Sequence, residues 1–279
     1  MKQWYLTIPS FVWLLIFFLI PTIIVASFSI RVAEPDGGLG SGWSFGTLDI
    51  LLEPKIILLF LRTITISILA TLGSVLLATP IAYTMARSTK KMQHLLLLLV
   101  VVPFWSSFLV RIFAWKSLLH PDGFVKQILV FFRIVSENTL LLYNDYAVIS
   151  VMIYTYLPFA ILTLYAAFSK FNFQLFDAAS DLGATKSQTF INVFMPNLKW
   201  AFVSAASMVF IPCIGAYVIS DIVGGTQAEM LGNEIAQKLF YDRNVPGASV
   251  LSTAITLLIL MPALAWSIVK PLSGSRGSQ

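Results

Sequence analysis

The sequence predicts an all-α, polytopic membrane protein that forms a single transmembrane domain over residues 1–279, and three observations lead to this prediction. Apolar residues make up 58% of the 279 residues, whereas Asp, Glu, Lys and Arg together make up 11%, less than half of the roughly 25% that is usual in soluble domains. The mean hydropathy is +0.85. The apolar residues also gather in six runs, each close to the ~20 residues that a helix needs to cross a membrane.

The six predicted transmembrane helices cover residues about 6–30, 57–85, 95–118, 146–169, 201–220 and 248–269. Stretches such as Leu95–Val102 contain no polar residue, unlike the amphipathic surface helices of soluble proteins. The first run is too long for the apolar part of a signal peptide and no small-residue cleavage site closes it cleanly, so we expect it to be retained as the first span. Prolines lie within or beside most spans, which predicts kinked helices.

The connections between the spans should alternate between the two sides of the membrane. One side would hold residues 31–56, 119–145 and 221–247, and the other the N-terminus, residues 86–94 and 170–200, and the tail from Lys270. Arg87, Lys90 and Lys91 crowd into the short 86–94 loop, and such loops lie in the cytoplasm by the positive-inside rule. Both termini are therefore predicted to be cytoplasmic.

Motifs for catalysis and for metal binding are missing from the sequence. There is no G-x-x-x-x-G-K-[ST] phosphate loop, so this chain has no ATP site of that type. Gly42–Gly46 reads G-x-S-x-G, but it follows a glycine-rich loop and lies far from His94 and His120, whereas a nucleophile elbow needs a strand before the Ser and a helix after it. We therefore expect no catalytic residues and no metal, and a membrane enzyme is disfavoured.

The connection 170–200 is long for a cytoplasmic loop and its sequence predicts two short helices. Acidic residues begin the first helix at Asp177, where they suit the helix dipole, and Gly183 would end it in the left-handed conformation that helix ends favour. Thr185 and Gln188 have the spacing of a capping box, which would start the second helix. Pro196 should close that helix. Physical reasoning leaves open whether this segment receives a partner or folds back on its own bundle.

The same segment resembles a known motif. Asp177-Ala178-Ala179 and Asp181–Ala184, followed by Phe190 and Met195-Pro196, resemble the EAA signature of permease subunits in binding-protein-dependent ABC importers. Three further segments resemble polyamine (spermidine/putrescine) permeases: Val102–Trp105, Tyr156–Phe159 and Tyr217–Gly225. Two departures are that Asp177 replaces the usual Glu, and that Asn197–Lys199 stands where the family often has a Pro-Gly turn.

The resemblance implies six spans with a cytoplasmic coupling loop, residues 170–200, between spans four and five. The loop residues that would contact an ATPase are Asp177, Ala178, Ala179, Asp181, Leu182, Gly183, Ala184, Phe190 and Pro196. The implied assembly contains a second six-span permease, two ATPase subunits and an external substrate-binding protein in a bacterial cytoplasmic membrane. ATP and Mg would bind the ATPases, and this chain would bind no cofactor.

A polyamine is a polycation, so its pathway should offer carboxylates and aromatic faces. The candidate pathway residues are Trp105, Tyr154, Tyr156, Tyr217 and Asp221. Tyr217 and Asp221 are four residues apart, so a continuing helix would put both on one face. Arg111 would repel a cation and is expected to reach the membrane surface or to pair with a carboxylate, and Glu234 is expected to be a solvated loop residue.

Two other transport functions stay open at this level. The chain could belong to an importer of another small solute, such as an amino acid, an anion or iron. It could also be a secondary carrier, which would predict inverted repeats and intramembrane carboxylates. Neither feature is evident in the sequence, and this disfavours the carrier.

Overall fold

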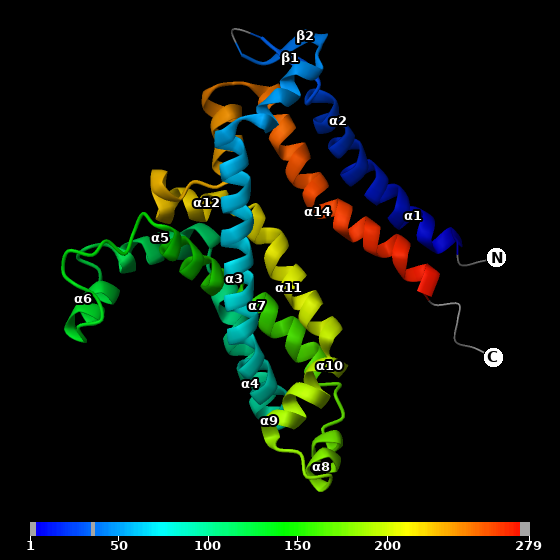
Figure 1. The fold of residues 1–279 in the computed structure, drawn as a ribbon, viewed down its shortest axis with the longest axis vertical. Coiled ribbons are helices and arrows are strands. Elements are labelled where there is room, and N and C mark those ends of the chain that lie inside the picture. Colours follow the sequence, from blue (N-terminus) through cyan, green and yellow to red (C-terminus); the bar gives the residue numbers. More distant parts are fainter. Residues whose placement is uncertain (1–3, 35–36, 274–279) are drawn as a thin grey trace. The chain divides into compact units, whose positions relative to one another are not determined.

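A computed structural model describes residues 4–34 and 37–273, and these residues are mostly helical with one small hairpin (Figure 1). The chain divides into two compact units. Unit 1 comprises residues up to Leu61 and from Met230 onward, and unit 2 comprises Arg62–Glu229. The long helix α3 (Pro54–Arg87) contributes to both units.

Unit 1 is built from apolar helices and the hairpin. Its elements are α1 (Trp4–Leu14), a π-helical turn (Leu15–Leu19), α2 (Ile20–Phe28), β1 (Arg31–Ala33), β2 (Leu39–Trp43), a 3-10 helix (Phe45–Leu52), the start of α3, α13 (Leu231–Ala236), a π-helical turn (Gln237–Tyr241) and α14 (Val245–Ser273). Strands β1 and β2 are antiparallel, with Arg31 opposite Trp43. The Arg31 guanidinium lies 4.4 Å from the centroid of the Trp43 ring, a cation–π contact across the hairpin.

Ser44 follows this hairpin and caps the 3-10 helix, because its side chain accepts a hydrogen bond from the Gly46 amide at 3.1 Å. The G-x-S-x-G match therefore belongs to a helix start rather than to a nucleophile. Behind the cap, Ile56, Leu59, Leu231 and Leu251 form a buried apolar core.

Glu234 in α13 differs from the expectation of a solvated loop residue. Its side chain is only 7% exposed and lies between Lys55 and Lys238, with Nζ–Oε distances of 2.6 Å and 3.4 Å. The expectation was wrong because the sequence does not show that Leu231, three residues earlier, enters the apolar core and carries α13 with it.

Unit 2 contains most of the helices. Its elements are α3 from Arg62, α4 (Lys90–Val101), a 3-10 turn (Val102–Trp105), α5 (Phe108–Leu119), α6 (Phe124–Phe131), α7 (Asp145–Phe168), α8 (Gln174–Asp181), α9 (Lys186–Thr189), a π-helical turn (Phe190–Phe194), α10 (Met195–Asn197), α11 (Lys199–Ile214), α12 (Tyr217–Ile219), a second π-helical turn (Ser220–Gly224) and a 3-10 turn (Gly225–Ala228).

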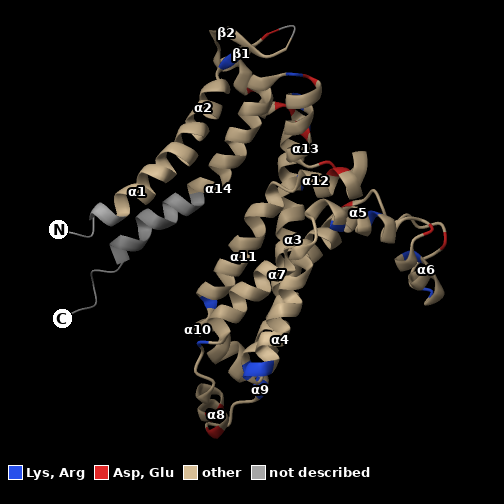
Figure 2. Cartoon of the chain, turned by 180° about the vertical axis from the view of Figure 1, so that it is seen from behind, with Lys and Arg blue, Asp and Glu red and all other residues tan. Residues whose placement is uncertain are grey.

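Helix α7 forms the centre of unit 2 and runs beside α11 (Figure 1). Asn144 caps its start by accepting a hydrogen bond from the Ala147 amide at 2.9 Å, as N-cap residues do. Helix α3 approaches α7 closely at Gly73, where an added Cβ would lie 2.5 Å from Ile153 Cδ1. The central stretches of α3, α7 and α11 carry no charged residue (Figure 2).

Three helices of the described residues are long and apolar enough to cross a membrane: Thr7–Phe28, Pro54–Arg87 and Asp145–Phe168. Two bent pairs raise this number to five if each pair forms one span: Lys90–Trp105 with Phe108–Phe131, bent by 90°, and Lys186–Asn197 with Lys199–Ile214, bent by 71°. Val245–Met261 is a shorter apolar helix, and the side chains of the sixth run from residue 262 on lie outside the described ones. The span count of six stays a prediction.

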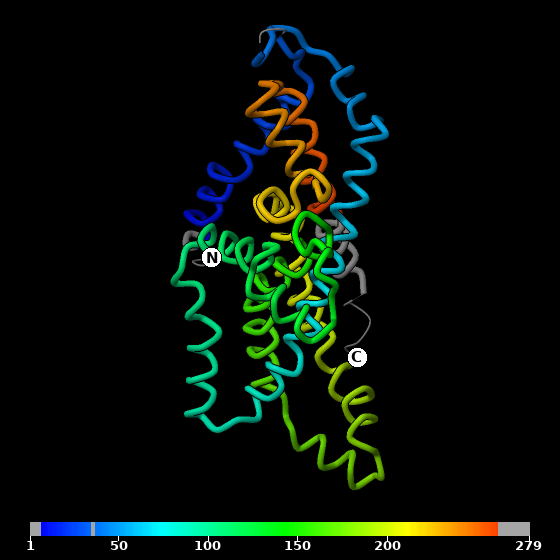
Figure 3. Tube along the Cα trace, turned by 90° about the vertical axis from the view of Figure 1, so that its left-hand side faces the viewer, coloured from blue at the N-terminus to red at the C-terminus, as the bar shows by residue number. Residues whose placement is uncertain are grey.

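The third predicted run, 95–118, is not one straight helix. The chain turns after α4 and α5 runs across its direction (Figure 3). Pro103 lacks an amide hydrogen for the helical ladder, and Ser106 and Ser107 adopt extended backbone, with ψ of 151° and 139°. The fifth run, 201–220, is also interrupted, because α11 ends at Ile214 before Gly215.

Candidate functional site

The 170–200 segment forms the two helices that its sequence predicts, although the first begins at Gln174 rather than Asp177 and Pro196 lies inside α10 rather than ending the second helix. Helix α8 ends at Asp181, and Gly183 has a φ of +84°. The Ala184 amide donates to the Ala179 carbonyl at 3.0 Å and the Gly183 amide to Ser180 at 2.9 Å, which is the Schellman ending of a helix. The capping box is present, because Thr185 Oγ1 accepts from the Gln188 amide at 3.3 Å and Gln188 Oε1 accepts from the Thr185 amide at 2.8 Å.

The turn between α8 and α9 presents small and apolar residues to the outside. Leu182 at its tip is 88% exposed. Of the other candidate contact residues, Asp177, Ala178, Asp181, Gly183 and Pro196 are exposed, and Ala179, Ala184 and Phe190 are half-buried. Space beside Gly183 is open, since an added Cβ would have no neighbour within 4 Å. Another protein surface could therefore approach this turn closely.

An aromatic cluster holds the 170–200 segment to the helices behind it. Phe194 is fully buried at its centre. The rings whose centroids lie 4.8–6.3 Å from that of Phe194 are Tyr83, Phe168, Phe171, Phe173, Phe176 and Phe190. Tyr83 belongs to α3 and Phe168 to α7. We call these residues the Phe194 cluster. Aromatic pairs at such distances contribute about 0.5–1.5 kcal/mol each beyond their burial, so the segment should move together with α3 and α7.

Sequence reasoning singled out Phe190 as a loop residue but did not predict the Phe194 cluster to which it belongs. The signal that could have found it is the density of phenylalanine between positions 168 and 194, at the end of the fourth predicted span and in the connection that follows it. Tyr83 has no such signal, because it lies more than eighty residues earlier in the chain.

Gln93 of α4 connects the end of α3 to α7 through hydrogen bonds. The side chain is 8% exposed, and its amide nitrogen donates to the Ser88 carbonyl at 3.0 Å and the Ala86 carbonyl at 3.3 Å. Its amide oxygen accepts from the Tyr165 hydroxyl at 3.3 Å. The loop between α3 and α4 is thereby fixed to α7, beside the cluster.

The five candidate pathway residues are not brought into one site. Trp105 is 81% exposed at the break after α4. Tyr154 packs against Trp115, with ring centroids 5.2 Å apart. Tyr156 is 7% exposed, and its hydroxyl donates to the Pro212 carbonyl near the end of α11 at 3.5 Å, a contact that supports a helix end.

Tyr217 and Asp221 remain together as candidates, since both are exposed in adjoining helical turns. The residues that follow them are held tightly: an added Cβ on Gly224 would lie 2.6 Å from Val148 Cγ2, and one on Gly225, where φ is +55°, would lie 2.9 Å from the Tyr143 ring. These glycines permit close packing of the 220–228 loop.

Arg62 of α3 contacts the same loop, although no motif in the sequence singles it out. Its Nη2 lies 2.6 Å from Asp145 Oδ1 and also donates to the Gln227 carbonyl. Arg111 was expected either to reach the membrane surface or to pair with a carboxylate. Within the described part of the chain it forms no ion pair, and its guanidinium lies 5.3 Å from the centroid of the Phe104 ring. Among the residues that the structure describes, no group of three or more His, Cys, Asp or Glu could hold a metal ion.

Solved structures establish the class of fold. The chain superimposes with a TM-score of 0.69, over 98% of its length and 96% of the other chain, on a bacterial ABC transporter involved in import of the acidic polysaccharide alginate, at 17% identity. The MetNI methionine ABC transporter gives a TM-score of 0.55 at 15% identity, over 78% of this chain and 97% of that chain. The fold is that of chains in ABC transporters.

Residues 74–269 match the family model described as the binding-protein-dependent transport system inner membrane component, and the chain belongs to this family. It is similar to proteins named spermidine/putrescine transport system permease protein PotB. The identity is 30% over 249 residues in Salmonella typhimurium strain SL1344, covering 89% of this chain and 86% of the relative. It is 29% in Escherichia coli K12, covering 89% and 90%, and 31% in Haemophilus influenzae, covering 90% and 88%.

Proposed function

We propose that this chain is a permease subunit of a bacterial ABC importer that carries polyamines, spermidine or putrescine, across the cytoplasmic membrane. The observation that carries the proposal is the similarity to the PotB permeases along nearly nine-tenths of the chain. The exposed turn at Leu182 supports it. A permease without its own phosphate loop needs a surface on which a separate ATPase subunit can dock, and this turn offers one.

In this proposal, the turn between α8 and α9 seats on a separate ATPase subunit in the cytoplasm. Closure of two ATPases around ATP and Mg would displace the turn, and the Phe194 cluster would pass the displacement to α3 and α7. The residues that touch the ATPase would be the small and apolar ones at the turn, and Gly183 would set its angle. A second permease would complete the pathway, and an external binding protein would deliver the substrate.

In this proposal, Tyr217 and Asp221 contact the polyamine. An ammonium group is stabilised both by a carboxylate and by an aromatic face. The Tyr217 and Asp221 side chains are both exposed at the start of the 220–228 loop, which Arg62 contacts. Trp105 and Tyr154 would serve as further aromatic contacts if the pathway extends along α5 and α7. Tyr156 would act by holding the end of α11, through its contact with Pro212.

The test is uptake of radiolabelled spermidine and putrescine in cells that lack this chain and in cells complemented with it. We expect uptake to require the chain and to be competed by unlabelled polyamine but not by methionine or phosphate. Uptake of an amino acid or anion that depends on the chain, with unchanged polyamine uptake, would establish the alternative of an importer for another solute. Uptake that survives loss of the ATPases would instead indicate a secondary carrier.

A further inference from the structure

Two cavities meet beside Tyr83 at the end of α3. The first has a volume of about 560 Å³ and is lined by side chains of α3, α8 and α9 and of the turn after α9. The second has a volume of about 700 Å³ and follows the side of α3 from Leu72 to Tyr83. Tyr83 and Phe190 line both cavities, so the two adjoin.

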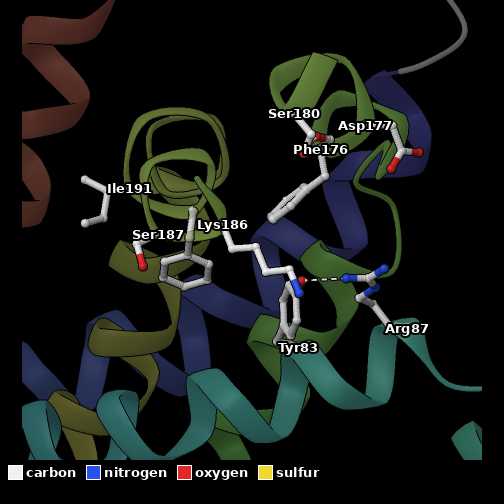
Figure 4. Close-up of a pocket in the computed structure, with 9 residues that line it drawn as sticks. Tyr83, Arg87, Phe176, Asp177, Ser180, Lys186, Ser187 and Ile191 are labelled. Atoms are coloured by element: carbon white, nitrogen blue, oxygen red, sulfur yellow. Dashed lines mark hydrogen bonds between the residues drawn. The ribbon is translucent and has the colours of Figure 1, made fainter. Parts of the chain in front are cut away.

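The first cavity has a mixed lining, in which the charged side chains leave an excess of one positive charge. Arg87 and Lys186 line it together with one carboxylate, Asp177 (Figure 4). Arg87 Nη1 donates to the Tyr83 hydroxyl at 2.9 Å, and its guanidinium lies 5.6 Å from the centroid of the Phe173 ring. These contacts hold one cation in place at the cavity, and a guanidinium has further N–H groups that suit a phosphate.

The second cavity is apolar. Its lining comes from α3, from the segment that leads into α11 and from α11 itself, and includes Val75, Pro80, Met195 and Phe202. It opens on an exposed flank of α3, where Leu72 and Leu76 are 61% and 74% exposed. From Leu72 to Tyr83 the helix rises about 16 Å at ~1.5 Å per residue, which is about half of the ~30 Å hydrocarbon thickness of a bilayer.

We propose that the paired cavities bind one anionic glycerophospholipid. Its phosphate would lie between Arg87 and Lys186, and one acyl chain would lie along α3 in the apolar cavity. The first cavity, with its charged residues, adjoins one end of the apolar second cavity, which is about as long as one leaflet is thick. A phospholipid has the same arrangement, with a charged headgroup at one end of its acyl chains. Basic pockets between transmembrane helices are typical sites for acidic lipid headgroups.

Such a lipid would bridge α3 and the 170–200 segment beside the Phe194 cluster. The bridge would make the attachment of that segment depend on the lipid composition of the membrane. The inference requires that the chain lies in a membrane and does not depend on which solute is carried.

The experiment uses native mass spectrometry of the complex that co-purifies with the tagged full-length chain in mild detergent. The probes are palmitoyl-oleoyl-phosphatidylglycerol, the same lipid with a phosphocholine headgroup, and free glycerol phosphate. We expect one phosphatidylglycerol to bind this chain about ten-fold more tightly than the choline lipid, because both lipids carry the phosphate but choline adds a trimethylammonium that Arg87 and Lys186 repel. Free glycerol phosphate should not bind at the same concentration.

Matched variants locate the site. Arg87→Gln with Lys186→Gln should weaken phosphatidylglycerol binding by about ten-fold or more. Lys91→Gln, at an exposed cation in the first turn of α4 that does not line the cavity, should not weaken it. Leu76→Trp should fill the apolar cavity and reduce binding, whereas Leu77→Trp, exposed on the same helix but outside the lining, should retain it.

Phosphatidylglycerol binding that is unaffected by both Arg87→Gln with Lys186→Gln and Leu76→Trp would overturn the proposal. Binding of free glycerol phosphate as strong as that of the lipid would also overturn it, and would identify a site for a soluble anion. Protection of the Leu76→Cys thiol from labelling by a partner chain, with no bound lipid, would overturn the proposal by showing that protein covers the apolar cavity. These results are read without transport, so they are independent of the proposed substrate.

Discussion

The ring of Tyr83 in α3 lies edge to face against the ring of Phe194, with centroids 5.5 Å apart and an interplanar angle of 85°. The two residues are more than a hundred positions apart, and their contact joins a long apolar helix to the segment that carries the EAA-like residues. Phe194 is fully buried, so this contact belongs to a packed core. A displacement of the exposed turn at Leu182 would therefore reach α3 through rigid neighbours rather than through a flexible linker.

Tyr83→Ala should uncouple ATP hydrolysis from transport. A fully buried aromatic ring contributes about 3–5 kcal/mol, and the half-buried Tyr83 should contribute less. We expect assembly to persist while polyamine uptake per ATP hydrolysed falls by about ten-fold, since each 1.4 kcal/mol corresponds to that factor. Tyr83→Phe keeps the ring and should retain coupling. Uptake per ATP is measured in reconstituted vesicles, and equal loss in both variants would contradict a role of the ring.

Gly183→Val should detach the ATPases. The φ of +84° costs a β-branched residue about 1–3 kcal/mol of backbone strain, and no clash adds to it because the space is open. The variant should insert into the membrane but lose ATPase subunits during purification, as read by pull-down.

Two controls separate docking from strain at Gly183. Gly183→Asn tolerates the left-handed region and should keep the ATPases. Gly38→Val places the same strain at a φ of +106°, also with open space, in the β1–β2 connection, and should keep them as well. Full retention of the ATPases by Gly183→Val would show that the turn is not the docking element.

The sequence predicts the local structure of the 170–200 segment well, and for a physical reason. The helix end at Gly183 and the capping box of Thr185 and Gln188 depend on residues within one or two turns of each other. The spacing of these residues in the sequence is therefore enough to predict both features. Family membership could be predicted for the same reason, since the motifs that resemble the importer permeases are local. The match of residues 74–269 to the family model confirms it.

Features that depend on distant residues could not be read from the sequence. Tyr83 acquires its role from Phe194, and Arg62 from Asp145 and Gln227. Apolar runs locate helices but do not show where they break, so the 90° bend between α4 and α5 was not predicted. Glu234 was expected in solvent because burial of α13 is set by packing against α3 and α14.

Asp221→Asn tests the proposed external mouth of the pathway. Loss of a charge-assisted contact costs about 1.5–3 kcal/mol, so uptake at limiting spermidine should fall by about ten-fold or more while the complex stays intact. Asn is close in size, so the change isolates charge. Asp242→Asn, at another exposed carboxylate, should leave uptake unchanged. Spermidine uptake by Asp221→Asn equal to wild type would make Asp221 an ordinary loop carboxylate.

Glu234→Gln should destabilise unit 1. Its carboxylate is buried between Lys55 and Lys238, and hydrogen bonds to charged groups contribute about 1.5–3 kcal/mol. We expect the purified complex to unfold several degrees lower, at roughly 2–4 °C per kcal/mol for a chain of this size. Glu229→Gln, at a half-buried position nearby in the sequence, is the control. Thermal unfolding in detergent is the measurement, and equal midpoints for the two variants would contradict a structural ion-pair group.

The central claim is tested most directly in vesicles that contain the complex purified through this chain, with ATP enclosed and the external binding protein and radiolabelled spermidine outside. The account predicts that spermidine accumulates in the lumen, that accumulation requires both ATP and the binding protein, and that it is lost in Gly183→Val vesicles. Accumulation without ATP, or ATP-driven accumulation of another solute while spermidine stays outside, would contradict the account.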